Sequence, residues 1–342
     1  MYYTGCDAHK KRCTLQHIDE DGTLGLMMTI TSSAQGFDSF LDKLDAPTVI
    51  TLEASRGYWW QHQYLSKHPK VSGVIVVDAY RSQKLCKELA VQKGYGRASN
   101  DRIDSEMLAE LTRRGLAVSI HVPTPEQLEL RSACRHRLEL KHNRTVSANL
   151  IHSTLAMHGH SIALKELIDN EESRKQLFEQ LPQYVQVIIT DLSTQVELFE
   201  KQIASTQRLL EKLLPESDPQ MQHIMTVPGF GPICSRILLS ETLDIAYFKA
   251  PKSLINYSGL APTQQESDGK RKGAIKLNRH CNYYLKYAFM TAAHAARTHP
   301  RYRRKYEQDI KKHGKIQAKI NLARRLAKAI YWMLNRHEPF KF

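Results

Sequence analysis

The sequence predicts an α/β domain in its first third and an all-α architecture for most of the remainder. Three observations lead to this prediction. Short apolar runs alternate with helix patterns over the first 120 residues, a heptad pattern occupies the middle, and a glycine-rich turn precedes a strongly basic segment. We therefore divide the chain into an α/β domain (1–120), a helical or coiled-coil arm (121–218) and a helical carboxyl-terminal domain (219–342).

The amino-terminal region begins with three strand-like runs, and the turn-forming DEDG joins the second to the third. Helix patterns and apolar strand patterns then alternate. This order of elements is that of an RNase H-like domain. The predicted strands are 2–7, 13–18, 23–30, 47–53 and 73–77, and the first helices are 34–44 and 58–67.

The middle region reads as two long helices. Thr124, Pro125 and Gln127 form a helix start with a capping box, and this basic helix is expected to end near His158. A second helix over 183–214 carries a heptad seam, which fits packing within one chain and self-association equally well. The seam consists of Ile189, Leu192, Val196, Phe199, Ile203, Thr206, Leu210 and Leu213.

The carboxyl-terminal region opens with TVPGFGPICSRILLSE at 226–241. Its glycines, Gly229 and Gly231, form a tight turn before an apolar helix. This pattern is typical of helix-hairpin-helix modules, in which backbone N–H groups at a helix start bind a nucleic-acid phosphate. A plain Gly-Pro connection between helices is the alternative.

Basic residues are concentrated at the carboxyl-terminal end of the chain. From Ser267 onward, 20 Lys and Arg residues face four acidic ones, whereas the first 266 residues have 29 against 31. Such segregation indicates nucleic-acid binding, with a solvated basic helix surface as the alternative. The candidate contacts are Gly229, Gly231, Lys270, Arg271, Lys272, Lys276, Arg279, Arg301, Arg303 and Arg304.

Other patterns exclude several classes of protein. The six cysteines are scattered and include no CxxC pair, so neither a zinc site nor a disulfide framework is predicted. The start of the chain lacks the apolar segment of a signal peptide, and no uncharged apolar run approaches the ~20 residues of a membrane span. We expect a soluble cytoplasmic protein without a membrane partner.

Four acidic residues lie where a metal site requires them. Asp7 and Glu53 each end an apolar strand, and Asp101 and Asp104 share one face of the helix that NDRIDSEMLAEL predicts. Hard divalent cations prefer such oxygen ligands. Taken alone, an acid at a strand end is more often a helix cap or a solvent-facing side chain, and one in a first helical turn usually complements the helix dipole. Together they predict a metal site.

Several segments resemble a known family. GCDAHK, TLEAS and NDRIDSEMLAEL resemble the signature blocks of DEDD-type insertion-sequence transposases, a family that has a RuvC-like catalytic domain and includes the Piv DNA invertases. Residues 254–288 resemble that family's carboxyl-terminal block. The resemblance covers essentially the whole chain. The serine-glycine turn departs from the family, because Asp268 follows Ser267 and the spacing from Ser267 to Gly273 is one residue short.

The resemblance implies a transposase or DNA recombinase. Mg²⁺ or Mn²⁺ would be held by Asp7, Glu53, Asp101 and Asp104, and Ser267 would form a covalent 5′-phosphoserine link to DNA, with Ser258 as the alternative nucleophile. The implied partners are donor and target DNA, a guide (bridge) RNA encoded by the element, and further copies of the chain in a dimer or tetramer. A bacterial, nucleoid-associated location follows.

Two other functions fit the residues. One is a RuvC-like, structure-specific endonuclease that uses water and forms no covalent intermediate. The other is a helix-hairpin-helix DNA-binding protein with an inert α/β domain. The carboxyl-terminal block favours the transposase, because a simple junction endonuclease needs neither that block nor a long helical arm.

Overall fold

A computed structural model describes residues 1–96, 100–267, 270–278 and 281–340, and for 263–276 this description is limited to the backbone. The chain forms two compact units, Met1–Val122 and Pro123–Phe342, and each is described separately. The three-part division predicted from the sequence divides the chain more finely than these two units do, and it stays a prediction. In the part of the chain described here, no helix is long and apolar enough to cross a membrane.

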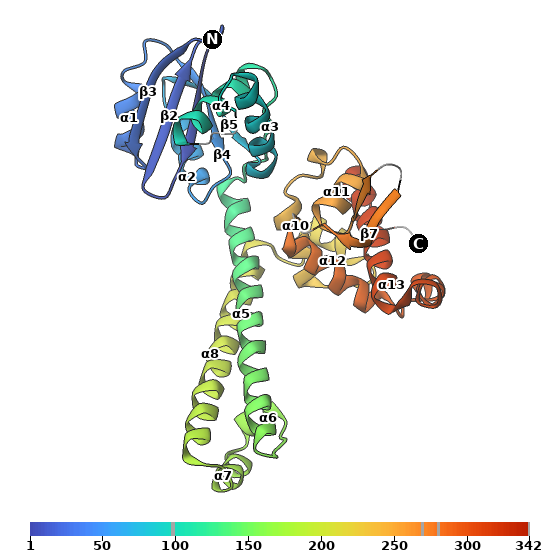
Figure 1. The fold of residues 1–342 in the computed structure, drawn as a ribbon. Helices are drawn as coiled ribbons and strands as arrows, with labels where there is room; N and C mark the ends of the chain where they lie inside the picture. Colours follow the sequence, from blue (N-terminus) through green and yellow to red (C-terminus); the bar gives the residue numbers. More distant parts are fainter. Residues whose placement is uncertain (97–99, 268–269, 279–280, 341–342) are drawn as a thin grey trace. The chain divides into compact units, whose positions relative to one another are not determined.

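A mixed five-stranded sheet forms the centre of the first unit (Figure 1). The strand order is β3-β2-β1-β4-β5, with β2 antiparallel to its neighbours β1 and β3, β4 parallel to β1, and β5 parallel to β4. This confirms the predicted α/β domain and is consistent with an RNase H-like fold. The strands are β1 (Tyr2–Ala8), β2 (Arg12–Ile18), β3 (Leu24–Thr31), β4 (Thr48–Glu53) and β5 (Val71–Val77).

Helices pack on both faces of this sheet, as the alternation of side chains along the strands requires. Phe37 and Phe40 of α1 and Leu65 of α2 are buried with Cys6 of β1 on one face, whereas α4 packs on the other. The helix α3 in turn packs on α4, with Leu89 buried in the same cluster as α4 residues. The helices are α1 (Ala34–Leu41), α2 (Tyr58–Leu65), α3 (Ala79–Gln92) and α4 (Asp101–Arg113).

The backbones of β1 and α4 approach each other unusually closely at Gly5. A Cβ at this position would lie 1.9 Å from the Ser105 carbonyl oxygen and 2.6 Å from the Ala109 nitrogen. The far end of α4 is tied to the loop between β2 and β3, because Arg113 Nη1 donates a hydrogen bond to the Glu20 carbonyl at 3.1 Å, while its Nε donates to Glu110 of the same helix at 2.7 Å. These contacts fix where the first turn of α4 lies beside the sheet.

A pair of long helices begins the second unit, with α5 and α8 lying side by side (Figure 1). Thr124 and Gln127 form the predicted capping box at the start of α5. The heptad seam of α8 faces α5 of the same chain, since Ile189, Val196 and Leu210 are almost completely buried. The helices are α5 (Pro125–Met157), α6 (Leu164–Asp169), α7 (Glu171–Glu179) and α8 (Gln183–Leu213).

The remainder of the second unit is a helical core. Its buried centre includes Phe230, Leu285, Phe289 and Leu326. The helices are α9 (Pro219–Met225), α10 (Pro232–Thr242), the 3₁₀ helix η1 (Ile245–Tyr247), α11 (Pro251–Tyr257), α12 (Tyr283–Ala296) and α13 (Pro300–Arg336).

One element differs from the all-helical prediction for this region. An antiparallel β-hairpin of β6 (Pro262–Ser267) and β7 (Lys270–Leu277) follows α11. The prediction was wrong here because these polar residues show no apolar alternation, whereas Asp268-Gly269 between the two strands is a common hairpin pair in sequence.

We predict that Gly5→Ala destabilises the protein by about 3 kcal/mol or more, because a methyl group overlaps the α4 backbone. Gly73→Ala is the matched control in β5, where an added Cβ meets nothing within 4 Å. It should be neutral or stabilising by up to about 1 kcal/mol. Chemical denaturation measures both, and equal effects of the two substitutions would contradict the close β1–α4 contact.

Candidate active site and nucleic-acid interface

Two of the predicted carboxylates lie at the ends of adjacent strands, Glu53 as the last residue of β4 and Asp7 as the last but one of β1. The parallel register pairs Gly5 with Thr51 and Cys6 with Leu52, so Asp7 and Glu53 come next on β1 and β4. Because side chains alternate along a strand, both lie on the face where Gly5 contacts α4. The sheet thus brings together two residues that are far apart in sequence.

The other two carboxylates lie in the first turn of α4. Asn100 caps this helix by accepting a hydrogen bond from the Ile103 N–H at 3.0 Å. Asp101 and Asp104 then project from one side of the turn. Burial is the largest cause that raises the pKa of Asp7 and of Glu53. The negative charges of Asp101 and Asp104 raise the pKa of Asp7 further, and the charge of Asp104 also raises the pKa of Glu53. The four predicted acidic residues thus act on one another electrostatically, with Asp7 influenced by both helix acids and Glu53 by Asp7 and Asp104.

The sequence analysis missed His9, which joins this cluster. Its Nε2 atom lies 3.3 Å from Asp7 Oδ2 and 3.4 Å from Asp101 Oδ1. One ligand atom from each of the three residues lies within 4.8 Å of the others. His9 follows the end of β1, where its N–H donates to the Arg12 carbonyl at 2.9 Å. The sequence feature that could have identified His9 is its position two residues after Asp7.

Burial opposes ionisation of the two strand carboxylates. Desolvation is the largest cause that raises the pKa of Asp7, and His9 opposes this rise. Desolvation also raises the pKa of Glu53, against the hydrogen bond that Ser82 Oγ donates to Glu53 Oε1 at 3.1 Å. The pKa of His9 is raised chiefly by the charge of Asp7. Bringing these acids together is thus unfavourable without a nearby positive charge.

The chemistry of this cluster fits a divalent cation. Half-buried carboxylates supply the oxygen ligands that Mg²⁺ and Mn²⁺ prefer, and a cation would offset both the desolvation and the mutual repulsion of the acids. Asp101 is 61% exposed at its side chain, so one side of the cluster is open to a substrate.

The predicted nucleophile ends β6. Ser267 pairs with Lys270 in the hairpin register, and its side chain is outside the described part of the structure. The same holds for the side chains of Lys270, Arg271, Lys272 and Lys276, and Arg279 lies wholly outside the described residues.

The alternative nucleophile, Ser258, is a poor candidate on geometric grounds. It is fully buried after α11, and its hydroxyl donates to the Leu254 carbonyl at 2.7 Å. A nucleophilic hydroxyl must be accessible to the phosphate that it attacks. Because Ser258 is buried and its hydroxyl is hydrogen-bonded within its own helix, its surroundings are those of a structural serine.

The two hairpin glycines have different surroundings. Gly229 has a φ of 91°, and a Cβ there would lie 2.1 Å from the Ala292 carbonyl oxygen of α12, so its smallness serves helix packing. Gly231 is the N-cap of α10 and has open space around its Cβ position. Of the two, Gly231 has the surroundings that suit an approaching phosphate.

The predicted arginines of α13 lie on its exposed surface. Arg301 stacks over the Phe340 ring with its Cζ atom 5.0 Å from the ring centroid. Arg303 is 69% exposed and pairs with Glu307 at 2.9 Å. These arginines, with the exposed Arg304, are accessible to a phosphate backbone.

A buried ionic network that the sequence did not reveal ties α5 to the carboxyl-terminal block. Glu241 of α10 is buried, and its two oxygens accept hydrogen bonds from Arg135 of α5 at 2.7 and 2.9 Å. Asn282, the N-cap of α12, also donates to Glu241 at 2.7 Å. The basic side of α5 is therefore partly structural, since Arg135 holds the start of α12 in place.

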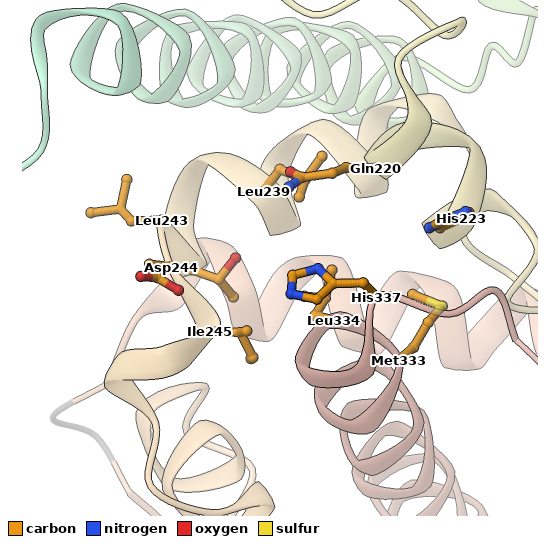
Figure 2. Close-up of a pocket in the computed structure, with 10 residues that line it drawn as sticks. Gln220, His223, Leu239, Leu243, Asp244, Ile245, Met333, Leu334 and His337 are labelled. Atoms are coloured by element: carbon orange, nitrogen blue, oxygen red, sulfur yellow. The ribbon is translucent and has the colours of Figure 1, made fainter.

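A separate pocket lies between α9, α10 and the end of α13 (Figure 2). His337 lies between Asp244 and Met333 in this view, and Leu239 lines the wall. His337 has a φ of 53° and ends α13. The lining mixes aliphatic side chains with a few polar ones and contains no paired carboxylates, so the cluster around Asp7 is the stronger candidate for catalysis.

Two protein-family models match the chain. A model of DEDD transposases of the IS110 type matches residues 4–159, and a model described as the transposase IS116/IS110/IS902 family matches residues 221–308. The first match contains Asp7, Glu53, Asp101 and Asp104, and the second contains Ser267.

Curated relatives carry similar descriptions. The transposase for insertion sequence element IS1111A of Coxiella burnetii is 22% identical over 71% of this chain and 68% of its own length. The transposase for IS1328 of Yersinia enterocolitica is 28% identical over 50% of this chain and 51% of its own length. A Streptomyces clavuligerus protein of insertion element IS116 is 27% identical over 45% and 38%, respectively. The chain thus spans from about two fifths to two thirds of these relatives.

We predict that Glu53→Gln stabilises the metal-free protein near neutral pH by up to about 1 kcal/mol, because it removes a carboxylate that is costly to ionise in the folded state. Burial raises the folded pKa of Glu53 above 4.5, so folding takes up protons and stability falls as pH rises through the raised pKa. The stability gain should therefore disappear below pH 4.5.

Urea denaturation in EDTA at about pH 4 and pH 7.5 measures this difference. Glu88→Gln, an exposed position on α3, is the matched control. A gain that is the same at both pH values, or a loss at pH 7.5, would contradict the cost of ionising Glu53.

Proposed function

The chain belongs to the IS116/IS110/IS902 transposase family, and we propose that it cuts and joins DNA strands for an insertion sequence at a divalent-metal centre formed by Asp7, Glu53, Asp101 and Asp104. The observation that carries this proposal is the electrostatic interaction of these four residues where the carboxyl ends of β1 and β4 lie beside the first turn of α4. The full activity, its substrates and its partners are proposals, because the curated relatives are matched over only part of their length.

In the proposed centre the four acidic residues act as two pairs, one from the sheet and one from α4. When bound, Mg²⁺ or Mn²⁺ supplies Lewis acidity toward a phosphate and its leaving oxygen. Asp7 and Glu53 hold the ion from the rigid sheet, with Ser82 orienting Glu53. Asp101 and Asp104 close the centre from the start of α4. His9 balances the charge of Asp7 and Asp101 and lies at the exposed side, where DNA would approach.

We propose that Ser267 is the nucleophile of the strand-transfer step. Its Oγ attacks phosphorus, an Oγ–P bond forms, and the bond from phosphorus to the 3′ oxygen breaks. The serine proton is lost to a base, and the leaving 3′ oxygen is protonated to a hydroxyl. This step conserves one phosphodiester bond, so a later 3′ hydroxyl can reverse it on another strand. Family membership supports this assignment, and the adjacent basic run of Lys270, Arg271 and Lys272 suits a phosphate.

We also propose the remaining partners, with family membership as their support. Donor and target DNA would contact the basic carboxyl-terminal segment, including Gly231, Arg301, Arg303 and Arg304. A guide RNA would provide target sequence by base pairing, in the manner of other RNA-guided systems. The protein would then act in the bacterial cytoplasm at the nucleoid.

We propose that the working form is a dimer or tetramer, since recombination must hold two duplexes. The seam of α8 is occupied by α5, so another surface is needed. Val187, Leu198 and Leu209 recur every 11 residues along α8 and are 55%, 51% and 42% exposed. This spacing places them on one helix face, which favours contact with a second copy.

Asp101→Asn should reduce metal-dependent DNA strand cleavage by at least about 100-fold, because it removes a ligand from the centre. The same variant should lose the rise in melting temperature that Mn²⁺ gives the wild-type protein. Asp169→Asn, an exposed change on α6, is the control. Full cleavage and unchanged Mn²⁺ stabilisation in Asp101→Asn would exclude this residue as a ligand.

A covalent protein–DNA adduct trapped during the reaction should map to Ser267 by mass spectrometry, and Ser267→Ala should abolish it. Ser258→Ala serves as the comparison, judged with its melting temperature because Ser258 is buried. Cleaved DNA without any adduct would instead favour the RuvC-like endonuclease. An adduct on another residue would remove Ser267 from the mechanism.

A further inference from the structure

The helix α13 contains a sharp reversal at Gly314. This residue has φ 81° and ψ 165°, a conformation available almost exclusively to glycine. Asp309 Oδ2 lies 2.5 Å from Arg325 Nη2, although residues 16 positions apart in a straight helix would be about 24 Å apart. The two parts of α13 therefore form a helical hairpin, and Figure 1 shows them running in different directions.

Buried contacts hold both arms of this hairpin. Asp309 is 6% exposed and its carboxylate lies near Lys305 as well as Arg325. Tyr302 on the first arm and Leu322 on the second belong to the same hydrophobic core. Arg324 Nε donates to the Leu260 carbonyl at 2.7 Å, next to the start of β6. The reversal is thus a fixed part of the unit.

The turn between the arms, residues 311–316, presents three lysines and a histidine around one apolar side chain. Lys311, Lys312, His313 and Lys315 are all exposed, and Ile316 is 80% exposed. The sequence has no Asp or Glu from Ile310 to His337, so no acidic side chain in this stretch offsets the charge. An isoleucine this exposed gains nothing from the chain's own core.

We propose that the 311–316 turn is a nucleic-acid wedge, in which the lysines bind phosphates on either side of a base step and Ile316 inserts against the bases. This inference rests on the proposed function as a DNA-acting enzyme. Apolar side chains flanked by cations are used in this way by proteins that unstack and kink a duplex. The same backbone chemistry occurs in DNA and RNA duplexes, so the test includes both.

A nucleic-acid partner fits this surface better than a protein partner. A single isoleucine offers too little apolar area for a stable protein interface, which typically buries about 800 Å² per partner. Cations spaced around one apolar group instead match two phosphate rows with a base step between them. The rigid hairpin also removes much of the ordering cost that a flexible basic tail would have.

The test uses the full-length protein with a labelled ~30-bp DNA duplex and, in parallel, an RNA hairpin of similar length, each with 2-aminopurine at internal steps. The triple variant Lys311→Gln, Lys312→Gln, Lys315→Gln should weaken binding about tenfold and reduce the salt slope by about 2 to 3 on DNA. Ile316→Ala should retain most of the affinity but lose the protein-induced rise in 2-aminopurine fluorescence.

The matched control is the triple variant Lys165→Gln, Lys175→Gln, Lys201→Gln, three exposed lysines on α6, α7 and α8. An equal loss of affinity in both triple variants, or a fluorescence rise that persists in Ile316→Ala, would overturn the wedge. Whichever of DNA and RNA shows both effects is the ligand. If the wild-type protein bound neither nucleic acid, the proposed function itself would fail, which is a different outcome from the loss of the wedge alone.

Discussion

The candidate site depends on one close contact, the approach of the β1 backbone to α4 at Gly5. No side chain larger than hydrogen fits between this residue and the Ser105 carbonyl. The contact places the first turn of α4 beside the ends of β1 and β4, where Asp7 and Glu53 emerge on the same face. A wider spacing would separate the helix acids from the strand acids, so backbone packing in the core sets the geometry of the site.

That geometry concentrates negative charge at some cost to stability. Desolvation raises the pKa values of Asp7 and Glu53, and His9 and Ser82, respectively, act against this rise. The opposite end of α4 shows the reverse situation, because Arg113 and Arg114 hold the pKa of Glu110 at about 2. One helix therefore combines an ion-paired far end with an acidic first turn beside two strand carboxylates whose pKa values are raised, an arrangement typical of functional sites.

Local patterns in the sequence were sufficient for the elements that depend on neighbouring residues. The capping box at Thr124, the strand ends at Asp7 and Glu53, and the shared helix face of Asp101 and Asp104 all follow from short-range spacing. Non-local contacts were not predictable in this way. The link from His9 to Asp101, the ties from Arg135 to Glu241 and the hairpin at Gly314 each depend on segments that only the fold brings together. The contact between the α8 seam and α5 was not predictable for the same reason, because it also joins segments that only the fold brings together.

The central claim is that Asp7, Glu53 and the α4 acids surround one divalent-cation position. Anomalous X-ray scattering from crystals of the protein grown with Mn²⁺ tests this most directly. We expect an anomalous peak at coordination distance from Asp7 and Asp101, with Glu53 and Asp104 on the same ion or on an adjacent one. A protein that is fully active with Mn²⁺, but whose manganese binds away from these carboxylates, would contradict the account.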